Sequence, residues 1–312
     1  MPDPAVAASY AHCRKVARSA ARNFYYGFLL LPAAKRDALC ALYAFMRHVD
    51  DISDEPGALD AKQRGLRELR AEMDRRLSAS AHGDSFWPAF CHTVATYKIP
   101  LRYLHDLISG AEMDLTITPY VTFDALREYC YRVAGTVGLC CLHVFGFTDP
   151  HAPELAERLG IAFQLTNILR DLPKDFAMGR VYLPREDFKK FASDPRHIGE
   201  GQSSPELLAL LRFEAERAWQ FYREGWKLLA LVSHDSRAAL WALARIYSGI
   251  LEKIEARNYA VLVPPPARLT TAEKVWILVR ARIGWLGETN ALRNRERDRR
   301  RTGGPVGRPG PR

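Results

Sequence analysis

Apolar residues recur at intervals of three and four along most of the chain. One such run consists of Leu39, Leu42, Tyr43, Met46 and Val49. A second run, over residues 155–169, has the same spacing. Side chains at these intervals share one face of an α-helix, whereas the strict alternation typical of β-strands is rare in this sequence. The pattern therefore predicts an all-α protein built from many helices.

Short segments rich in Gly, Pro, Ser and Asp interrupt the helical pattern and predict loops. They lie at residues 78–84, 119–122, 149–153, 193–205 and 264–271. The chain has 312 residues, of which 48% are hydrophobic, which is enough for one large core. Because the composition does not change abruptly from one segment to the next, we expect a single helical domain over residues 1–290.

The positive charge is concentrated near the C-terminus. The chain has 45 Lys and Arg against 36 Asp and Glu, a formal net charge of +9. Residues 293–312 contain eight Arg, with Glu296 and Asp298 as the acids, and so hold +6 of this charge. We expect residues 291–312 to form a disordered basic tail, with weak attraction to anionic lipid as an alternative role. The small excess elsewhere argues against a nucleic-acid partner.

The cysteines and the apolar stretches indicate the compartment. Six cysteines, at positions 13, 40, 91, 130, 140 and 141, lack C-x-x-C spacing, so we expect reduced thiols. The longest uncharged stretch, Val133 to Thr148, has 16 residues, fewer than a membrane span needs. The N-terminal residues lack the order of parts found in a signal peptide. We expect a cytoplasmic protein whose membrane contact, if it has one, is peripheral.

The first acidic motif is Asp50-Asp51-Ile52-Ser53-Asp54. On a helix, Asp50 and Asp54 stand one turn apart and continue the apolar face formed by Tyr43 and Met46. Like charges at this spacing repel each other, so a cation would stabilise them. A solvated surface is the simpler alternative, but the inward direction of this face favours a site.

The second acidic motif ends a long helical pattern. Gln164, Asn167, Asp171 and Asp175 follow one another at steps of three and four and share one edge of the predicted helix. Such polar groups are costly to bury unless something binds them. Pro173 lacks a backbone N–H, and it predicts a kink or a helix end that would move Asp175 relative to Asp171.

Two carboxylate pairs with amides beside them, and without His or Cys at ligand spacing, are typical of a site for a hard cation. Mg²⁺ takes one or two carboxylates and completes its shell with water and substrate phosphates. The sequence has no G-x-x-x-x-G-K-[ST] loop, so a nucleotide is not indicated. Residues 129–138 are rich in small side chains, which either leave room for an apolar ligand or allow helices to pack closely.

Six motifs in register resemble those of the squalene and phytoene synthases, and the resemblance extends over residues 10–262. The motifs are residues 23–28 with Leu31-Pro32, and residues 41–51, 110–115, 129–138, 164–175 and 179–184. Each motif is weak alone, but their common order is specific. The resemblance implies an isoprenoid synthase fold, in which the helices surround a central cavity.

The resemblance also implies roles for individual residues. The implied Mg²⁺ ligands and catalytic carboxylates are Asp50, Asp54, Asp171 and Asp175, with Asn167 as a further metal ligand. The implied substrate-binding residues are Tyr43, Arg47, Gln164, Asn167, Arg170, Tyr182 and Tyr247. Tyr129 is implied as the catalytic residue that handles protons.

The activity implied by the resemblance is the head-to-head condensation of two prenyl diphosphates. We expect two farnesyl diphosphates to give presqualene diphosphate, and then squalene if NADPH supplies a hydride. The close alternative is a phytoene synthase that joins two geranylgeranyl diphosphates. A head-to-tail elongator should carry a second Asp-Asp-x-x-Asp, which is absent, and a noncatalytic relative that binds lipid or a partner should have lost acids from one motif. The sequence indicates no oligomeric state.

Overall fold

The computed structural model describes residues 3–78, 85–116, 118–201 and 203–283. Within these ranges the chain is helical and has no β-strand, which confirms the all-α prediction. The helices are α1 (Pro4–Ala20), α2 (Arg22–Phe28), α3 (Ala33–Asp54), α4 (Leu59–Ser78), α5 (Trp87–Tyr97), α6 (Leu101–Leu115), α7 (Phe123–Cys130), α8 (Thr136–Phe145), α9 (Ala152–Ala177), α10 (Arg185–Lys190), α11 (Arg196–Gly199), α12 (Pro205–Gly225), α13 (His234–Ala256) and α14 (Thr271–Ile283). A π-helical segment, η1 (Tyr131–Gly135), joins α7 to α8, and a 3₁₀ segment, η2 (Trp226–Ala230), follows α12.

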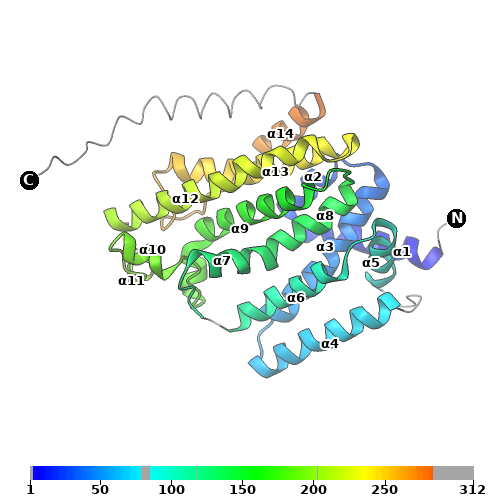
Figure 1. Ribbon diagram of the computed structural model, residues 1–312, viewed down its shortest axis with the longest axis horizontal. Helices are drawn as coiled ribbons and strands as arrows, with labels where there is room; N and C mark the ends of the chain where they lie inside the picture. The colour runs from blue at the N-terminus through cyan, green and yellow to red at the C-terminus, as the bar shows by residue number, and fades with distance from the viewer. Residues whose placement is uncertain (1–2, 79–84, 117, 202, 284–312) are drawn as a thin grey trace, which may run out of the picture.

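The long helix α9 lies in the middle of the molecule (Figure 1). It packs against α12 and α13 on one side and against η1 and α8 on the other. Helix α6 packs on η1, α8 and α3, and α4 covers the outer side of α6. One large apolar cluster runs through these helices, from Cys13 in α1 to Ala267 beyond α13. The face of each helix that carries the three-and-four pattern therefore points into a shared core.

Small residues allow η1 and α8 to approach α9 closely. A Cβ atom at Gly160 of α9 would collide with the carbonyl oxygen of Ala134, and one at Gly138 would lie 2.7 Å from the carbonyl oxygen of Ala156. Both interpretations of residues 129–138 are therefore correct, because Gly138 allows close helix packing and Val133, Ala134 and Val137 line a cavity.

Helix α9 does not end at Pro173, as the sequence suggested it could, but continues to Ala177. Pro173 has no N–H to donate to the Leu169 carbonyl, so the helix continues past it without this one backbone hydrogen bond. Asp171 and Asp175 are therefore on one helix. In the described ranges, no helix is long and apolar enough to cross a membrane. The predicted domain boundary at residue 290 and the predicted tail, residues 291–312, lie outside the described residues.

Candidate active site

A cavity of about 400 Å³ lies between α2, α3, α6, α7, α8, α9, α13, η1 and η2. One end is apolar, and its lining includes Phe24, Phe28, Leu39, Leu42, Leu240 and Leu243. The other end is polar, and its lining includes Asp50, Ser53, Asp54, Asp114, Gln164, Asn167 and Arg180. A ligand with a charged head and an apolar chain would match both ends.

Helix α3 supplies the first acidic pair. Tyr43, Met46, Asp50 and Asp54 all line the cavity, as their spacing predicts. Burial among protein atoms and repulsion from Asp54 raise the pKa of Asp50 to about 7, although Arg47 acts in the opposite direction. The Asp50 side chain nevertheless remains exposed to solvent inside the cavity, so a ligand can reach it.

Arg47 is not part of the described cavity lining. It forms an ion pair with Asp51, the acid of the first motif that faces away from the cavity, with 2.6 Å between Nη2 and Oδ1. Both side chains are partly exposed. Arg47 is close enough to Asp50 to affect its pKa, but its own partner is Asp51.

Helix α9 supplies the second polar row. Gln164 and Asn167 line the cavity, whereas Asp171 and Asp175 lie one and two turns further along the helix, beyond the described lining. The Asp171 carboxylate accepts two hydrogen bonds from Arg170. Nε donates to Oδ1 at 2.8 Å, and Nη2 donates to Oδ2. Burial and repulsion from Asp171 raise the pKa of Asp175 to about 6.

Tyr129 meets two residues from other elements at the polar end. Its hydroxyl donates to Asp114 Oδ2 at 2.9 Å, and the Tyr182 hydroxyl donates to Asp114 Oδ1 at the same distance. The two tyrosine rings are stacked, with centroids 5.1 Å apart. Burial, together with the charge of Asp114, raises the pKa of Tyr129 well above its ordinary value. Tyr129 therefore stays protonated, as a hydrogen-bond donor.

Arg180 is the cation of this site, and the sequence analysis assigned it no role. It lies in the turn after α9, where its backbone N–H donates to the Asp175 carbonyl at 2.8 Å. Burial alone would lower the pKa of Arg180, but Tyr182, Asp114 and Asp54 raise it overall. Arg180 therefore interacts with carboxylates from two different helices, Asp54 of α3 and Asp114 of α6.

Asp114 is the second residue that sequence reasoning missed. Burial is the main cause of its raised pKa, opposed by the Tyr182 hydroxyl and Arg180. Asp114 and Arg180 both fall within motifs that carry the family resemblance, at residues 110–115 and 179–184. Their place in these two motifs was the signal that could have found them, because helical spacing alone predicts no partner for either residue.

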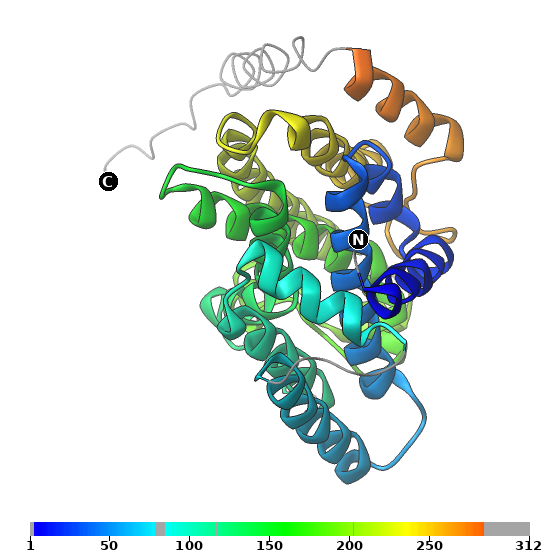
Figure 2. The same cartoon turned by 90° about the vertical axis from the view of Figure 1, so that its right-hand side faces the viewer.

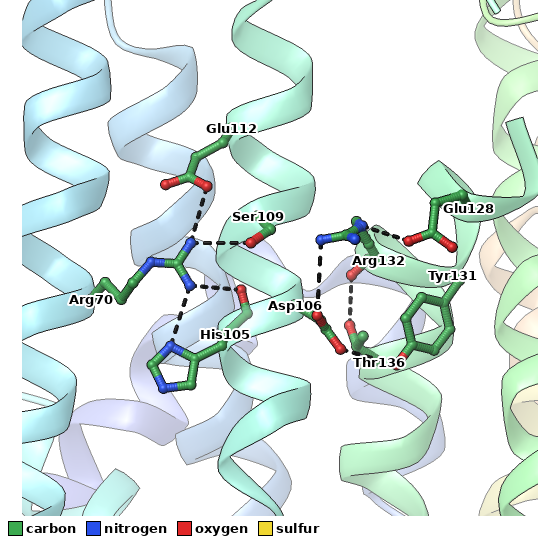
Figure 3. Close-up of polar contacts among 9 residues, drawn as sticks. All are labelled: Arg70, His105, Asp106, Ser109, Glu112, Glu128, Tyr131, Arg132 and Thr136. Carbon is green, nitrogen blue, oxygen red and sulfur yellow. Dashed lines mark hydrogen bonds and ion pairs between the residues drawn. The ribbon is translucent and has the colours of Figure 1, made fainter. Parts of the chain in front are cut away.

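The helix that carries Asp114 is fixed from two sides (Figure 3). On one side, Arg70 of α4 donates to Ser109 at 3.1 Å and to Glu112 at 3.0 Å. On the other side, the Tyr131 hydroxyl of η1 donates to Asp106 Oδ2 at 3.0 Å. These contacts hold α6 between α4 and η1 and so fix the position of Asp114 opposite Tyr129.

Tyr247 lies behind the cavity wall. Its ring stacks on Phe163, with centroids 4.3 Å apart, and Phe163 lines the cavity. Of the predicted site residues, the structure thus places Tyr43, Asp50, Asp54, Tyr129, Gln164 and Asn167 in the lining. It places Arg47, Arg170, Asp171, Asp175, Tyr182 and Tyr247 around that lining.

The donor set fits a hard divalent cation. Asn167 Oδ1 is buried and has no hydrogen-bond partner in the described part of the chain. Burial, together with repulsion from a second carboxylate, raises the pKa values of Asp50 and Asp175, and a bound cation would offset this repulsion. No three His, Cys, Asp or Glu side chains within the described ranges form a metal site on their own. Mg²⁺ does not require such a set, because water and substrate phosphates complete its shell.

These pKa values predict how the stability of the metal-free protein depends on pH. The folded protein holds protons on Asp50 and Asp175 up to about pH 7 and 6, whereas an unfolded Asp releases its proton near 3.8. The folded state therefore loses stability as the pH rises from about 4 to 7. Urea unfolding in EDTA should find Asp50→Asn more stable than wild type at pH 8 and equal to it at pH 4. A variant less stable than wild type at pH 8 would contradict this prediction.

An all-helical bundle around a cavity with carboxylates in its lining fits the isoprenoid synthase fold that the sequence resemblance implies. The squalene/phytoene synthase family profile matches residues 17–273. The chain is 34% identical to the 15-cis-phytoene synthase of Synechocystis sp., over 88% of this chain and 87% of that protein. It is 39% identical to the phytoene synthase of Mycobacterium tuberculosis, over 80% of this chain and 82% of that protein.

Solved structures agree with this comparison. A dehydrosqualene synthase in complex with ligand superposes with a TM-score of 0.82 and 31% identity, over 89% of this chain and 96% of that one. Squalene synthase HpnC from Alicyclobacillus acidocaldarius superposes with a TM-score of 0.76 and 28% identity, over 81% of this chain and 95% of that one. The chain belongs to the squalene/phytoene synthase family. It is a prenyltransferase of that type, and the reaction class is head-to-head prenyl condensation.

Proposed function

We propose that this enzyme joins two geranylgeranyl diphosphates head to head, as a phytoene synthase. The observation that carries the proposal is the 34–39% identity to phytoene synthases that match it over most of their length. The sequence alone placed two farnesyl diphosphates first and this C20 reaction second. The relatives favour the reverse order.

The polar end of the cavity would hold the two diphosphates. We assign Asp50, Asp54, Asp171 and Asp175 to Mg²⁺, with Asn167 Oδ1 as a further ligand. The family uses divalent metal for diphosphate ionisation. When bound, Mg²⁺ would neutralise the negative charge that develops on diphosphate as its carbon–oxygen bond breaks. Gln164, lining the cavity beside Asn167, would orient a diphosphate oxygen by hydrogen bonding.

Cationic side chains around the carboxylates would complete diphosphate binding. Arg180 faces the cavity between the two acidic groups and would contact a diphosphate directly. Arg170 holds Asp171 and would fix the orientation of its carboxylate. Arg47 would either leave Asp51 to contact substrate or support Asp50 from beside the cavity.

The aromatic residues would bind the reacting allyl groups. The Tyr43 ring lies in the lining next to Met46, and Tyr247 supports Phe163 from behind. Tyr129 and Tyr182 are held by Asp114 at the polar end, and the ring of Tyr129 lines the cavity. Ring faces stabilise a nearby cation, and the apolar walls exclude the water that would otherwise capture it. Tyr129 would also direct the proton that the first condensation releases.

In the first step, C–C bonds form between the two allyl groups and give a cyclopropylcarbinyl diphosphate. One diphosphate and one proton are released. Loss of the second diphosphate then allows rearrangement. A product that forms by loss of a proton, such as phytoene, needs no reductant. A product that forms by capture of a hydride, such as squalene, needs NADPH. The requirement for NADPH therefore separates loss of a proton from capture of a hydride, and the chain length of the product separates the C20 substrate from the C15 substrate.

A second candidate is the condensation of two farnesyl diphosphates. It is supported by the superposition on a dehydrosqualene synthase, with a TM-score of 0.82. Purified protein should be incubated with Mg²⁺ and each diphosphate, with and without NADPH. Our proposal predicts a C40 product from geranylgeranyl diphosphate without NADPH. A C30 product from farnesyl diphosphate, with none from the C20 substrate, would overturn it in favour of the second candidate.

The depth of the apolar end gives a prediction about chain length. Cys141 of α8 lines the cavity, so a larger side chain there would reduce the space for the isoprenoid chain. We expect Cys141→Phe to lower kcat/KM for geranylgeranyl diphosphate by at least about tenfold, since overpacking a cavity is costly, while farnesyl diphosphate is affected less.

The control for this change is Cys141→Ala, which removes the thiol without filling the cavity. It should keep the substrate preference of the wild type. If Cys141→Phe lowers kcat/KM equally for both substrates, the side chain at this position does not determine which chain length the cavity accepts.

A further inference from the structure

Helix α14 has an apolar face that the rest of the described chain leaves uncovered. Its exposed side chains are Val275, Trp276, Val279 and Ile283, with exposed fractions of 47, 61, 40 and 82%. The opposite face is buried, where Ile277 and Ala281 pack on Trp241 and Ile246 of α13. Figures 1 and 2 both show α14 at the outer edge of the molecule.

The exposed apolar side chains form a narrow stripe with a cation on each side. At about 100° per residue, the four side chains fall within about 100° of the helix circumference. Arg282 lies about 20° beyond Val275 at one border, and Arg280 lies about 40° beyond Trp276 at the other. Both arginines are exposed. An apolar stripe between basic borders, with a tryptophan in the stripe, is typical of helices that lie in a membrane surface.

We propose that this stripe of α14 docks on an anionic membrane surface. The charges are complementary, because Arg280 and Arg282 would meet lipid phosphates while the stripe enters the apolar boundary. The sequence that follows adds eight Arg in residues 293–312. This proposal does not depend on which prenyl diphosphate the enzyme uses.

The position of α14 also relates the membrane to the cavity. Helix α14 packs on α13 and α2. Those two helices supply Leu240, Leu243, Phe24 and Phe28 to the apolar end of the cavity. The docking face therefore lies on the outer side of two helices that line the cavity.

Vesicle flotation with the full chain tests this proposal. We expect the protein to float with vesicles of phosphatidylcholine and phosphatidylglycerol, less with phosphatidylcholine alone, and less at high salt. Trp276→Glu combined with Val279→Glu should lower the bound fraction at least about tenfold. Arg280→Glu combined with Arg282→Glu should also lower it, and should reduce its salt dependence.

The matched control is Val121→Glu, which changes an equally exposed apolar residue, at 61%, between α6 and α7. It should bind vesicles like wild type. Melting temperatures should be unchanged in all variants, which shows that they are folded. Wild type that does not float, or Trp276→Glu with Val279→Glu floating like wild type, would overturn the proposal. A dimer in light scattering that these two substitutions dissociate would also overturn it, because the stripe would then meet a second copy of the chain.

Discussion

Asp50→Asn should lower turnover at least about 100-fold while the protein stays folded. The substitution keeps the size of the side chain but removes the charge that a divalent cation needs. Asp50 lies in the cavity lining, and its raised pKa, about 7, reflects burial and repulsion from Asp54. Losing that charge relieves repulsion in the metal-free protein, so the melting temperature in EDTA should not fall. Diphosphate release from prenyl diphosphate measures the first effect, and calorimetry measures the second.

The control for Asp50→Asn is the neighbouring Asp51→Asn. Asp51 has the same chemistry, but it pairs with Arg47 on the side of α3 that faces away from the cavity. We expect the turnover of Asp51→Asn to stay within about threefold of wild type, because Asp51 does not line the cavity. Its fold should also be unaffected, because an exposed ion pair contributes little stability. If both variants lose activity equally, the charge of the whole motif, and not the position of Asp50, is what matters. If Asp50→Asn melts far below wild type, this carboxylate is structural.

Tyr129→Ala should have the second-largest effect, and Tyr129→Phe should be much milder. The ring is buried and stacked on Tyr182, so removing it opens a cavity that costs about 3–5 kcal/mol. It also removes the aromatic face from the site of the proposed allyl cation. We expect turnover of Tyr129→Ala to fall at least about 100-fold, measured at a temperature where the variant is folded.

Tyr129→Phe keeps the ring and removes only the hydroxyl that donates to Asp114. Loss of one such hydrogen bond costs about 1–3 kcal/mol, and Tyr182 and Arg180 still interact with the carboxylate. We expect a loss of turnover of about tenfold or less. If Tyr129→Phe is as inactive as Tyr129→Ala, the hydroxyl itself moves a proton that the reaction requires. The ratio of the turnover of Tyr129→Phe to that of Tyr129→Ala therefore separates the role of the ring from that of the hydroxyl.

Features that depend on helical spacing could be predicted from the sequence. The row of Tyr43, Met46, Asp50 and Asp54 on α3 lines the cavity because residues three and four apart share a face. The row of Gln164 and Asn167 on α9 follows the same rule. The fold class could be predicted for the same reason, since a repeated three-and-four pattern has few structural interpretations.

Features that depend on contacts between distant segments could not be predicted. Asp114 meets Tyr129 and Tyr182 only because α6, α7 and the turn after α9 converge, and no local pattern encodes that convergence. The fold likewise brings Arg180 close to Asp54 and Asp114, which come from two other helices. The π-helical turn at Tyr131–Gly135 inserts an extra residue per turn, which a pattern read as α-helix does not reveal.

The central claim is that the two carboxylate helices bind diphosphate together through divalent cations. Calorimetry with inorganic pyrophosphate tests it most directly, because no reaction is needed. We predict that pyrophosphate with Mg²⁺ raises the melting temperature of the wild type, whereas either one alone does not. Asp50→Asn and Asp171→Asn, on opposite helices, should each remove this increase. An equal increase with pyrophosphate in EDTA, or an increase that both variants retain, would contradict the account.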